Sequence, residues 1–238
     1  MTILLVDGDI VAYQAATASE HPIHWGDDLW TLHSFADEAA QYAKNMVDTL
    51  TKEAGCSRAL VLLTKGNVFR KEIDPEYKAN RVGKRKPVCL GEVREYMRKT
   101  MKTFWVDGLE ADDLIGILAT ANRNQYVIWS PDKDLRQIAG QHFVKGEVVT
   151  VTKEEADRWF WTQVLTGDTA DNYKGCSGVG PVKAERILDE DNGMTTWQKV
   201  VAAYEKAGQT EHDAIITARL AHILTYDTKD ELWEPPSD

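Results

Sequence analysis

The sequence predicts an α/β fold with a central, mostly parallel sheet. Short apolar runs alternate with stretches in which apolar residues recur every three or four positions, a pattern typical of buried strands joined by amphipathic helices. The 238 residues suffice for one large domain with an appendage. With 43% hydrophobic and 28% charged residues, the composition is that of a globular protein and excludes a disordered or fibrous chain.

The first half of the chain supplies two continuous apolar runs that are too short for helices. These runs, at residues 3–6 and 59–63, are predicted to be buried strands. A helix is expected over residues 10–18. A second helix is expected to begin with the capping box that opens at Ser34, and to end at Gly55.

The second half continues the alternation and then becomes helical. We expect, in chain order, a strand at 104–106, a helix at 111–119, a strand at 126–129, a short helix at 132–139 and a helix capped by Thr152. After Gly167 the pattern is helical almost to the end, and the tail at 234–238 is expected to be frayed. We therefore predict a core over residues 1–150 and a helical subdomain over residues 151–238.

Membrane insertion and secretion are not expected. No apolar run approaches the ~20 residues that a spanning helix requires, and no basic start precedes a long apolar stretch. The cysteines Cys56, Cys89 and Cys176 are odd in number and lack metal-ligand spacing. Reduced thiols in a cytoplasmic protein are therefore the expectation.

The charge is distributed unevenly. The net charge of −10 would by itself disfavour a polyanionic partner. Residues 70–102, however, hold eleven Lys/Arg and five Asp/Glu, a net charge of +6, which leaves −16 on the rest of the chain. A phosphate-binding strip beside acids that hold divalent cations would explain this pattern.

Nine carboxylates form four clusters where predicted strands or helices end. They are Asp7 and Asp9; Glu110, Asp112 and Asp113; Asp132 and Asp134; and Asp168 and Asp171. A single acid of this kind is usually a helix cap, but repeated like-charge pairs are unfavourable unless a cation compensates them. Carboxylate oxygens without His or Cys select Mg²⁺ or Mn²⁺. Two such ions roughly 4 Å apart serve phosphodiester hydrolysis.

Two further segments suit phosphate binding. The glycine-rich turn at 175–183 leads into a helix start, which attracts phosphate. A plain interhelical turn is the default for such a segment, but Lys174 and the nearby acids favour binding. The basic window offers cations and an aromatic ring, Tyr77, that could stack on a base. The candidate DNA-binding residues are Tyr77, Lys84, Arg85, Lys86, Lys174, Gly178, Gly180, Lys183 and Arg186.

Five motifs occur in a fixed order along residues 3 to about 190. They are VDGD at 6–9, PEYKANR at 75–81, EADD at 110–113, SPDKD at 130–134, and GDTADN at 167–172 followed by GVGPVKA at 178–184. This set resembles the flap endonuclease-like 5′-nucleases, which include phage 5′→3′ exonucleases and the 5′-nuclease domain of bacterial DNA polymerase I. The resemblance implies a PIN-like α/β/α domain with a basic arch region at about 70–102. It also implies a helix–three-turn–helix DNA-binding element at about 164–190.

The resemblance also implies roles for individual residues. Lys78 and Arg81, with Tyr77, match arch-base residues that meet the scissile phosphate, and Gly178 to Lys183 match the hairpin of the DNA-binding element, which in relatives can also hold K⁺. The metal-binding acids are matched by Asp7, Glu110, Asp112, Asp113, Asp132, Asp134, Asp168 and Asp171. Two Mg²⁺ or Mn²⁺ ions and a DNA substrate with a 5′ end, flap or nick are therefore expected, and RNA–DNA hybrid is a further candidate.

The chain departs from the family at one position. An Asp usually follows the second strand, but here the stretch after Leu63 begins with Thr64 and Lys65. Either Asp9 replaces that ligand or the first metal site lacks it. The chain is expected to be free-standing rather than joined to a polymerase, and by similarity it looks most like a phage replication or recombination nuclease acting in the host bacterial cytoplasm.

Three functional hypotheses follow. The first is a metal-dependent 5′-nuclease, acting as a 5′→3′ exonuclease, a flap endonuclease or both, and able to remove RNA primers. The second is a non-catalytic, structure-specific DNA-binding protein on the same fold. The third, a haloacid-dehalogenase-like phosphatase suggested by Asp7-Gly8-Asp9, leaves the basic window and the hairpin unexplained. The sequence does not distinguish a 5′→3′ exonuclease from a flap endonuclease. It also leaves open the type of substrate and the oligomeric state.

Overall fold

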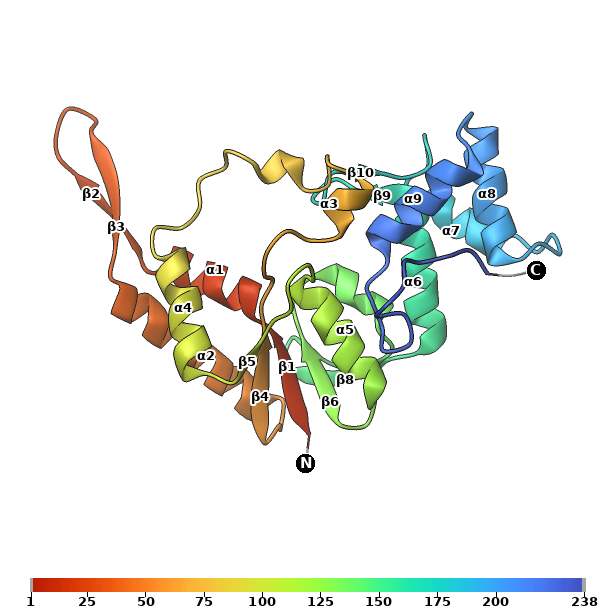
Figure 1. Cartoon of the computed structure of the whole chain (residues 1–238). Helices are drawn as coiled ribbons and strands as arrows, with labels where there is room; N and C mark the ends of the chain where they lie inside the picture. Colours follow the sequence, from red (N-terminus) through yellow and green to blue (C-terminus); the bar gives the residue numbers. More distant parts are fainter. Residues whose placement is uncertain (1, 237–238) are drawn as a thin grey trace.

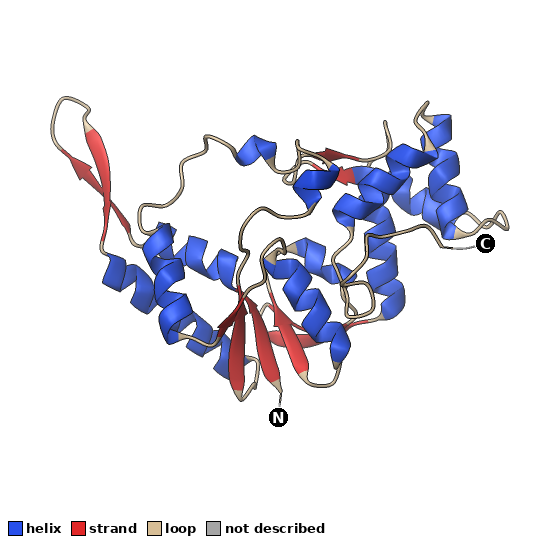
Figure 2. Ribbon diagram, viewed as in Figure 1, coloured by secondary structure: helices blue, strands red, loops and turns tan. Residues whose placement is uncertain are grey.

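A six-stranded sheet forms the centre of the computed structural model, which describes residues 2–236 (Figures 1 and 2). The strand order is β5-β4-β1-β6-β7-β8, and among the pairings described within this sheet only β7–β8 is antiparallel. The predicted α/β fold with a mostly parallel sheet is therefore confirmed. The strands are β1 (Ile3–Asp7), β4 (Arg58–Leu62), β5 (Thr103–Phe104), β6 (Tyr126–Trp129), β7 (Gly140–Val144) and β8 (Glu147–Val151).

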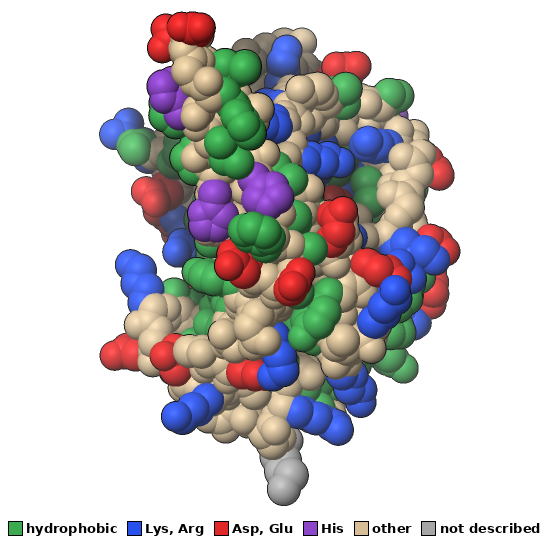
Figure 3. Space-filling model, turned by 90° about the vertical axis from the view of Figure 1, so that its left-hand side faces the viewer, with side chains coloured by type: hydrophobic (Ala, Val, Ile, Leu, Met, Phe, Trp, Pro, Cys, Tyr) green, Lys and Arg blue, Asp and Glu red, His purple; other side chains and the backbone are tan. Residues whose placement is uncertain are grey.

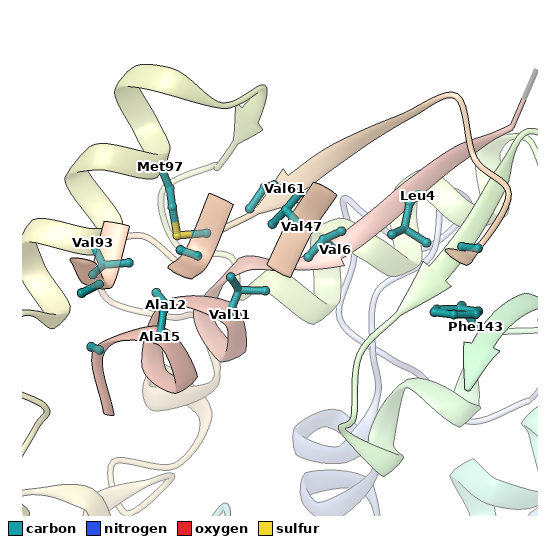
Figure 4. Close-up of a cluster of buried hydrophobic side chains, with 14 of the residues drawn as sticks. Leu4, Val6, Val11, Ala12, Ala15, Val47, Val61, Val93, Met97 and Phe143 are labelled. Carbon is teal, nitrogen blue, oxygen red and sulfur yellow. The ribbon is translucent and has the colours of Figure 1, made fainter. Parts of the chain in front are cut away.

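Helices cover both faces of this sheet. Side chains alternate along β1, so Leu4 and Val6 face one layer while Leu5 faces the other. The first layer consists of α1 (Gly8–Ala18), α2 (Ala36–Glu53) and α4 (Leu90–Thr100), and Figure 4 shows its core. On the opposite face lies α5 (Ala111–Ala121), which packs Leu114 and Ile115 against Leu5. Burial on both faces explains the continuous apolar runs of β1 and β4.

The C-terminal part forms a second hydrophobic cluster. It contains α6 (Lys153–Thr166), α7 (Pro181–Asp189), α8 (Thr196–Lys206) and α9 (Glu211–Ala221), together with a short hairpin of β9 (Gly167–Asp168) and β10 (Tyr173–Lys174). The capping box at Thr152 is present. Tyr77 from the basic window and Val68, which precedes the window, pack into the same cluster. The window is therefore anchored on the C-terminal helices as well as on the sheet.

The basic window crosses the carboxyl ends of the central strands. It contains α3 (Arg70–Ile73) and the short 3₁₀ helix η1 (Ala79–Arg81), and then continues as a loop into α4. In Figure 1 this loop, drawn in yellow, passes over α1 on its way to α4. This path places the positive charges of the window opposite the strand ends.

Three hairpins were not predicted from the sequence, and the last of them along the chain, β9–β10, lies where helix was expected after Gly167. β2 (Glu20–His24) and β3 (Trp30–Ser34) form an antiparallel hairpin that stands away from the core (Figure 1). Figure 3 faces this hairpin and shows hydrophobic and His side chains exposed on it. The second is the β7–β8 hairpin, whose turn contains Lys145 and Gly146 with positive φ angles of 52° and 86°.

Several predicted boundaries also need correction. Ser34 ends β3, and the N-cap of α2 is Phe35, which makes no side-chain capping bond, so the predicted capping box at Ser34 is wrong. The expected helix at 132–139 is the shorter 3₁₀ helix η2 (Lys133–Gln137), and the strand at 104–106 is β5. Regular helix ends at Ala221. In the tail, Glu234 pairs with Arg219, and residues 237–238 lie outside the described part.

A search of the described residues found no helix with the length and apolar character needed to cross a membrane. All three cysteines are free thiols, as predicted.

Candidate functional site

A cleft of about 820 Å³ lies between the strand ends and the basic window. Parallel strands place their carboxyl ends at one edge of a sheet, which is where ligands bind in open α/β folds. Acids line the cleft on the sheet side: Asp7, Asp9, Glu110, Asp112 and Asp132. Cations line it from the window and α4: Lys71, Lys78, Arg81, Lys84, Lys86 and Arg94. The cleft therefore sets negative and positive side chains opposite each other.

The two acids at the end of β1 have different partners. Asp7 is buried, and its Oδ1 caps α1 by accepting from the backbone N–H groups of Asp9 and Ile10, while its Oδ2 accepts from Ser130 Oγ at 3.0 Å. Asp9 accepts from the backbone N–H of Thr64 at 3.0 Å and pairs with Arg94. Both oxygens of Asp9 are thus engaged. Arg94 also donates to the carbonyl of Thr64 at 2.6 Å, in the stretch where the family pattern led us to expect an acid.

Three acids converge at the start of α5. Glu110, Asp112 and Asp113 each offer a carboxylate oxygen within 4.8 Å of the other two. Glu110 and Asp113 form the capping box of α5, which fixes both side chains to the helix start. Asp112 is partly exposed toward the cleft, and its Oδ1 accepts from the Asp113 N–H. This group has the carboxylate composition that Mg²⁺ and Mn²⁺ prefer.

Arg70, a residue the sequence reasoning missed, lies against this group. Its side chain is only 2% exposed. One guanidinium nitrogen, Nη1, contacts Glu110 Oε2 at 2.9 Å and Asp113 Oδ2 at 2.7 Å. The other, Nη2, contacts Asp113 Oδ1 at 2.7 Å. Arg70 was one cation among eleven in the window, and no local pattern distinguished it from the exposed ones.

Tyr77, Lys78 and Arg81 bridge the α5 acids to the β9–β10 hairpin. Lys78 Nζ lies 2.5 Å from Glu110 Oε1 and 3.3 Å from Asp171 Oδ2, and Arg81 Nη2 lies 2.5 Å from Asp171 Oδ1. Lys78 has a φ of 57°, an unusual backbone conformation for a side chain of this size. Tyr77 is only 2% exposed, with its hydroxyl 3.0 Å from both Glu110 and Asp171. The expectation that Tyr77 stacks on a base is therefore wrong in this structure.

The remaining acids lie beside the cleft on neighbouring loops. Asp132 caps η2 and faces the cleft, whereas Asp134 accepts from Gln163 Nε2 at 2.7 Å. Asp168 is buried in the β9–β10 hairpin and pairs with Lys133 at 2.8 Å. Of the nine predicted acids, five line the cleft, while Asp113, Asp134, Asp168 and Asp171 lie outside its lining.

Burial and neighbouring carboxylates raise the pKa values of three of these acids. Burial and the nearby Asp9 raise the pKa of Asp7 to about 7. Burial, with Asp132 and Asp168, raises the pKa of Asp134 to about 7. The pKa of Asp112 is raised well above its usual range by burial and by the adjacent Glu110 and Asp113. These raised pKa values are what a site adapted to a cation shows when only protein charges are present.

Glu110 shows the opposite balance. Burial alone would raise its pKa, but the charges of Arg70 and Lys78 bring it below the ordinary value. The same acids act in return on Lys78: burial lowers its pKa, and Glu110, Asp112 and Asp171 more than offset that effect and raise it. Glu110 and Lys78 are therefore both charged at neutral pH.

The predicted DNA-binding residues fall into two groups. Lys84 and Lys86 line the cleft, while Arg85 between them pairs with Glu20 at the base of the β2–β3 hairpin. The second group surrounds the start of α7 and consists of Lys174, Gly178, Gly180, Lys183 and Arg186. Gly180 is the N-cap of α7, and Gly178 has a φ of 70°, which favours glycine. Lys183 Nζ donates to the Gly178 carbonyl at 3.2 Å.

The sequence of this chain is similar to those of known proteins. Residues 2–166 match the family model of the 5'-3' exonuclease N-terminal resolvase-like domain. The exodeoxyribonuclease of Enterobacteria phage T3 is 30% identical, over 99% of this chain and 93% of that protein. The thermostable DNA polymerase I of Thermus aquaticus is 30% identical over 79% of this chain, which spans only 24% of the polymerase.

A solved structure agrees with this comparison at the level of the fold. The T5 D15 protein, crystallised with metal ions, superposes with a TM-score of 0.70 at 17% identity, over 96% of this chain and 91% of that one. Because the family model covers more than half of the chain and the phage relative matches along its length, this chain belongs to the 5′-3′ exonuclease family of nucleases.

Proposed function

We propose that the protein is a divalent-metal-dependent 5′-nuclease that hydrolyses phosphodiester bonds at or near the 5′ ends of DNA. The observation that carries the proposal is the cleft itself, where Asp7, Glu110, Asp112 and Asp132 face a wall of six cations. Acids alone fit a metal site and cations alone fit a phosphate site. Their juxtaposition in a family of nucleases suits metal-assisted cleavage of a nucleic-acid backbone.

Carboxylates at and beside the strand ends are suited to hold the metal. Asp7, Glu110, Asp112 and Asp132 form the first group of ligands, and Asp134, Asp168 and Asp171 form a second group on the η2 and β9–β10 loops. Asp9 and Asp113 stand outside this set, because an arginine and backbone N–H groups together engage both oxygens of each. Mg²⁺ or Mn²⁺, with two ions, fits hard oxygen ligands of this number. When bound, such ions supply a reactive water and neutralise the leaving oxygen.

Lys78 and Arg81 act on the phosphate from the opposite wall. Lys78 is held by Glu110 and Asp171 with little exposure, so its charge is fixed in place before substrate arrives. A preorganised cation of this kind stabilises the charge that develops on a phosphate in the transition state. Arg81 is more exposed and is suited to orient the same group.

The helices that follow α6 provide the second contact with DNA. The turn at Gly178 and Gly180 presents the start of α7, and Lys174, Lys183 and Arg186 supply charge around it. The main-chain oxygens of this turn are the place proposed for K⁺. We propose the division at residue 150, with the nuclease core before it and this helical DNA-binding subdomain after it. Duplex DNA beside a 5′ end, flap or nick, and RNA–DNA hybrid, fit this two-part surface, with the bacterial host cytoplasm as the place of action.

The test is a product ladder from 5′-labelled flap, nicked, blunt and RNA-primed substrates in Mg²⁺, Mn²⁺ and Ca²⁺. Short labelled products in Mg²⁺ or Mn²⁺, with binding alone in Ca²⁺, are expected. The substrate that is cleaved fastest decides between exonuclease and flap activity. Binding without cleavage in every metal would favour the alternative, a non-catalytic structure-specific DNA-binding protein. The observation that favours this alternative is the Arg94–Asp9 pair beside Thr64, because it engages Asp9 where the family pattern lacks an acid.

A further inference from the structure

Arg70 makes a complete set of hydrogen bonds in the interior of the protein. Its Nε donates to the carbonyl of Leu220 at 3.0 Å, and Nη2 donates to the carbonyl of His222 at 2.6 Å in addition to Asp113. With the contacts to Glu110 and Asp113, all five N–H groups of the guanidinium have acceptors. A side chain so fully bonded and so deeply buried has one orientation.

Asp113 is equally saturated. Both of its oxygens accept from Arg70 at 2.7 Å in the two-pronged geometry that guanidinium and carboxylate favour. Oδ1 also accepts from the backbone N–H of Leu224, and Oδ2 accepts from that of Glu110, each at 3.2 Å. The residue is 0% exposed. A metal ion could bind Asp113 only if one of these four contacts were broken.

Glu110 and Asp112 differ from Asp113 in this respect. Glu110 Oε2 accepts from Arg70 and Tyr77, but its Oε1 accepts from the ammonium of Lys78 at the wall of the cleft. Asp112 has only one hydrogen bond among the described residues, from the Asp113 N–H to Oδ1, and it faces the cleft. Glu110 and Asp112 thus line the cleft, Glu110 with Oε1 bonded only to the Lys78 ammonium there and Asp112 with Oδ2 unbonded among the described residues, whereas Asp113 does not line it.

Arg70 also connects two distant parts of the chain. Leu220 and His222 lie at the C-terminal end of α9, where backbone carbonyls have no partners within the helix and where positive charge is favourable. The guanidinium donates hydrogen bonds to these carbonyls and to Glu110 and Asp113 at the same time. A shift of α9 therefore moves Arg70, and with it the carboxylate of Glu110.

We propose that Arg70 is a positioning residue that withdraws Asp113 from the metal-ligand set and ties it, together with Glu110, to the end of α9. The proposal rests on the proposed nuclease function for the identity of the cleft. It assigns Asp113 to the framework and Asp112 to the metal, although the two are adjacent in sequence and alike in chemistry. Asp112 and Asp113 therefore provide a matched pair of variants.

The experiment compares Asp112→Asn with Asp113→Asn in two assays, Mn²⁺ binding by calorimetry or electron paramagnetic resonance, and thermal unfolding without metal. Asp112→Asn should lower Mn²⁺ affinity at least tenfold with an unchanged or raised Tm, because it removes one of several crowded negative charges. Asp113→Asn should keep Mn²⁺ affinity within about threefold of wild type but lower the Tm by several degrees. Loss of Mn²⁺ affinity in Asp113→Asn to the same extent as in Asp112→Asn would overturn the assignment.

A second variant covers the case in which Asp113→Asn does not fold. Arg70→Met combined with Asp113→Leu removes both charges together, and buried ion pairs replaced in this way by apolar side chains often retain stability. Mn²⁺ affinity in this double variant should remain within about threefold, since Glu110 keeps Lys78 and Tyr77 as partners. A tenfold loss would contradict the proposal. Failure of the wild-type protein to bind Mn²⁺ would instead refute the proposed function.

Discussion

Replacing Lys78 by Met distinguishes a role of this residue in the cleavage step from a role in DNA binding. The substitution keeps the apolar stem of the side chain but deletes the ammonium, which lies 2.5 Å from Glu110 Oε1 and 3.3 Å from Asp171 Oδ2. The side chain is 18% exposed, so the change leaves two largely buried carboxylates with one cation fewer. Arg70 and Arg81 still pair with these acids.

Two magnitudes follow from these contacts. Because Arg70 and Arg81 compensate the same carboxylates, the free energy of unfolding should fall by only about 1–2 kcal/mol, below the cost of leaving a buried charge unpaired. The loss of a preorganised charge at the transition state should be larger, about 3 kcal/mol or roughly 150-fold in rate. DNA affinity should fall by about one phosphate contact.

Single-turnover cleavage in Mg²⁺ and equilibrium binding in Ca²⁺ measure these two effects separately. Lys71→Met is the matched control, because Lys71 lines the same cleft but is exposed and forms no salt bridge within the described residues. The control should lose at most a few-fold in affinity and little in rate. If Lys78→Met lost only affinity, Lys78 would be part of a docking strip and its placement in the chemistry would be refuted.

Three further outcomes are expected. Lys183→Glu should weaken binding to duplex DNA and flatten its dependence on salt, while Mn²⁺ affinity stays unchanged; an unaltered salt slope would make the α7 turn purely structural. Burial and Arg70 lower the pKa of His222 to about 4. Between pH 6.5 and 4 the unfolded chain therefore binds a proton at His222 that the folded protein does not bind. The free energy of unfolding falls as the pH falls through this window. His222→Gln should therefore recover about 2–3 kcal/mol of the unfolding free energy lost between pH 7 and 4.5, as urea titrations can show. A Cβ on Gly175 would lie 2.3 Å from the backbone nitrogen of Gly167, so Gly175→Ala should lower the Tm by about 5 °C, whereas Gly91→Ala, with open space around it, should not.

The sheet and its helices could be predicted because they depend on local signals. β1 and β4 are continuous apolar runs that become buried on both faces, and the Thr152 capping box marks the start of α6. The β2–β3 hairpin gave a weaker signal, since most of its side chains are exposed and the apolar–polar alternation covers only Trp30 to His33. Its turn contains Gly26 and two aspartates, all with positive φ, and these residue types were the other local sign of a hairpin.

The clustering of acids was predictable, but their partners were not. The rule that parallel strands end at one edge of the sheet brings Asp7 and Asp132 together from far apart in the sequence. Whether a given acid faces the cleft depends on cations that approach from elsewhere. Arg70 reaches Asp113 across 43 positions, and Arg94 reaches Asp9 across 85. Neither pairing has a periodicity or spacing that the sequence displays.

The central claim is that the carboxylates of this cleft hold the metal that cleaves DNA. Its most direct test is cleavage of a 5′-labelled nicked duplex in Mg²⁺ by wild type and by Asp112→Asn, with binding to the same duplex measured in Ca²⁺. Wild type should release short labelled products in Mg²⁺ and none in Ca²⁺. Asp112→Asn should bind the duplex at least as tightly, because it removes a negative charge from the cleft, and should release almost no product. Cleavage by Asp112→Asn at the wild-type rate would contradict the account.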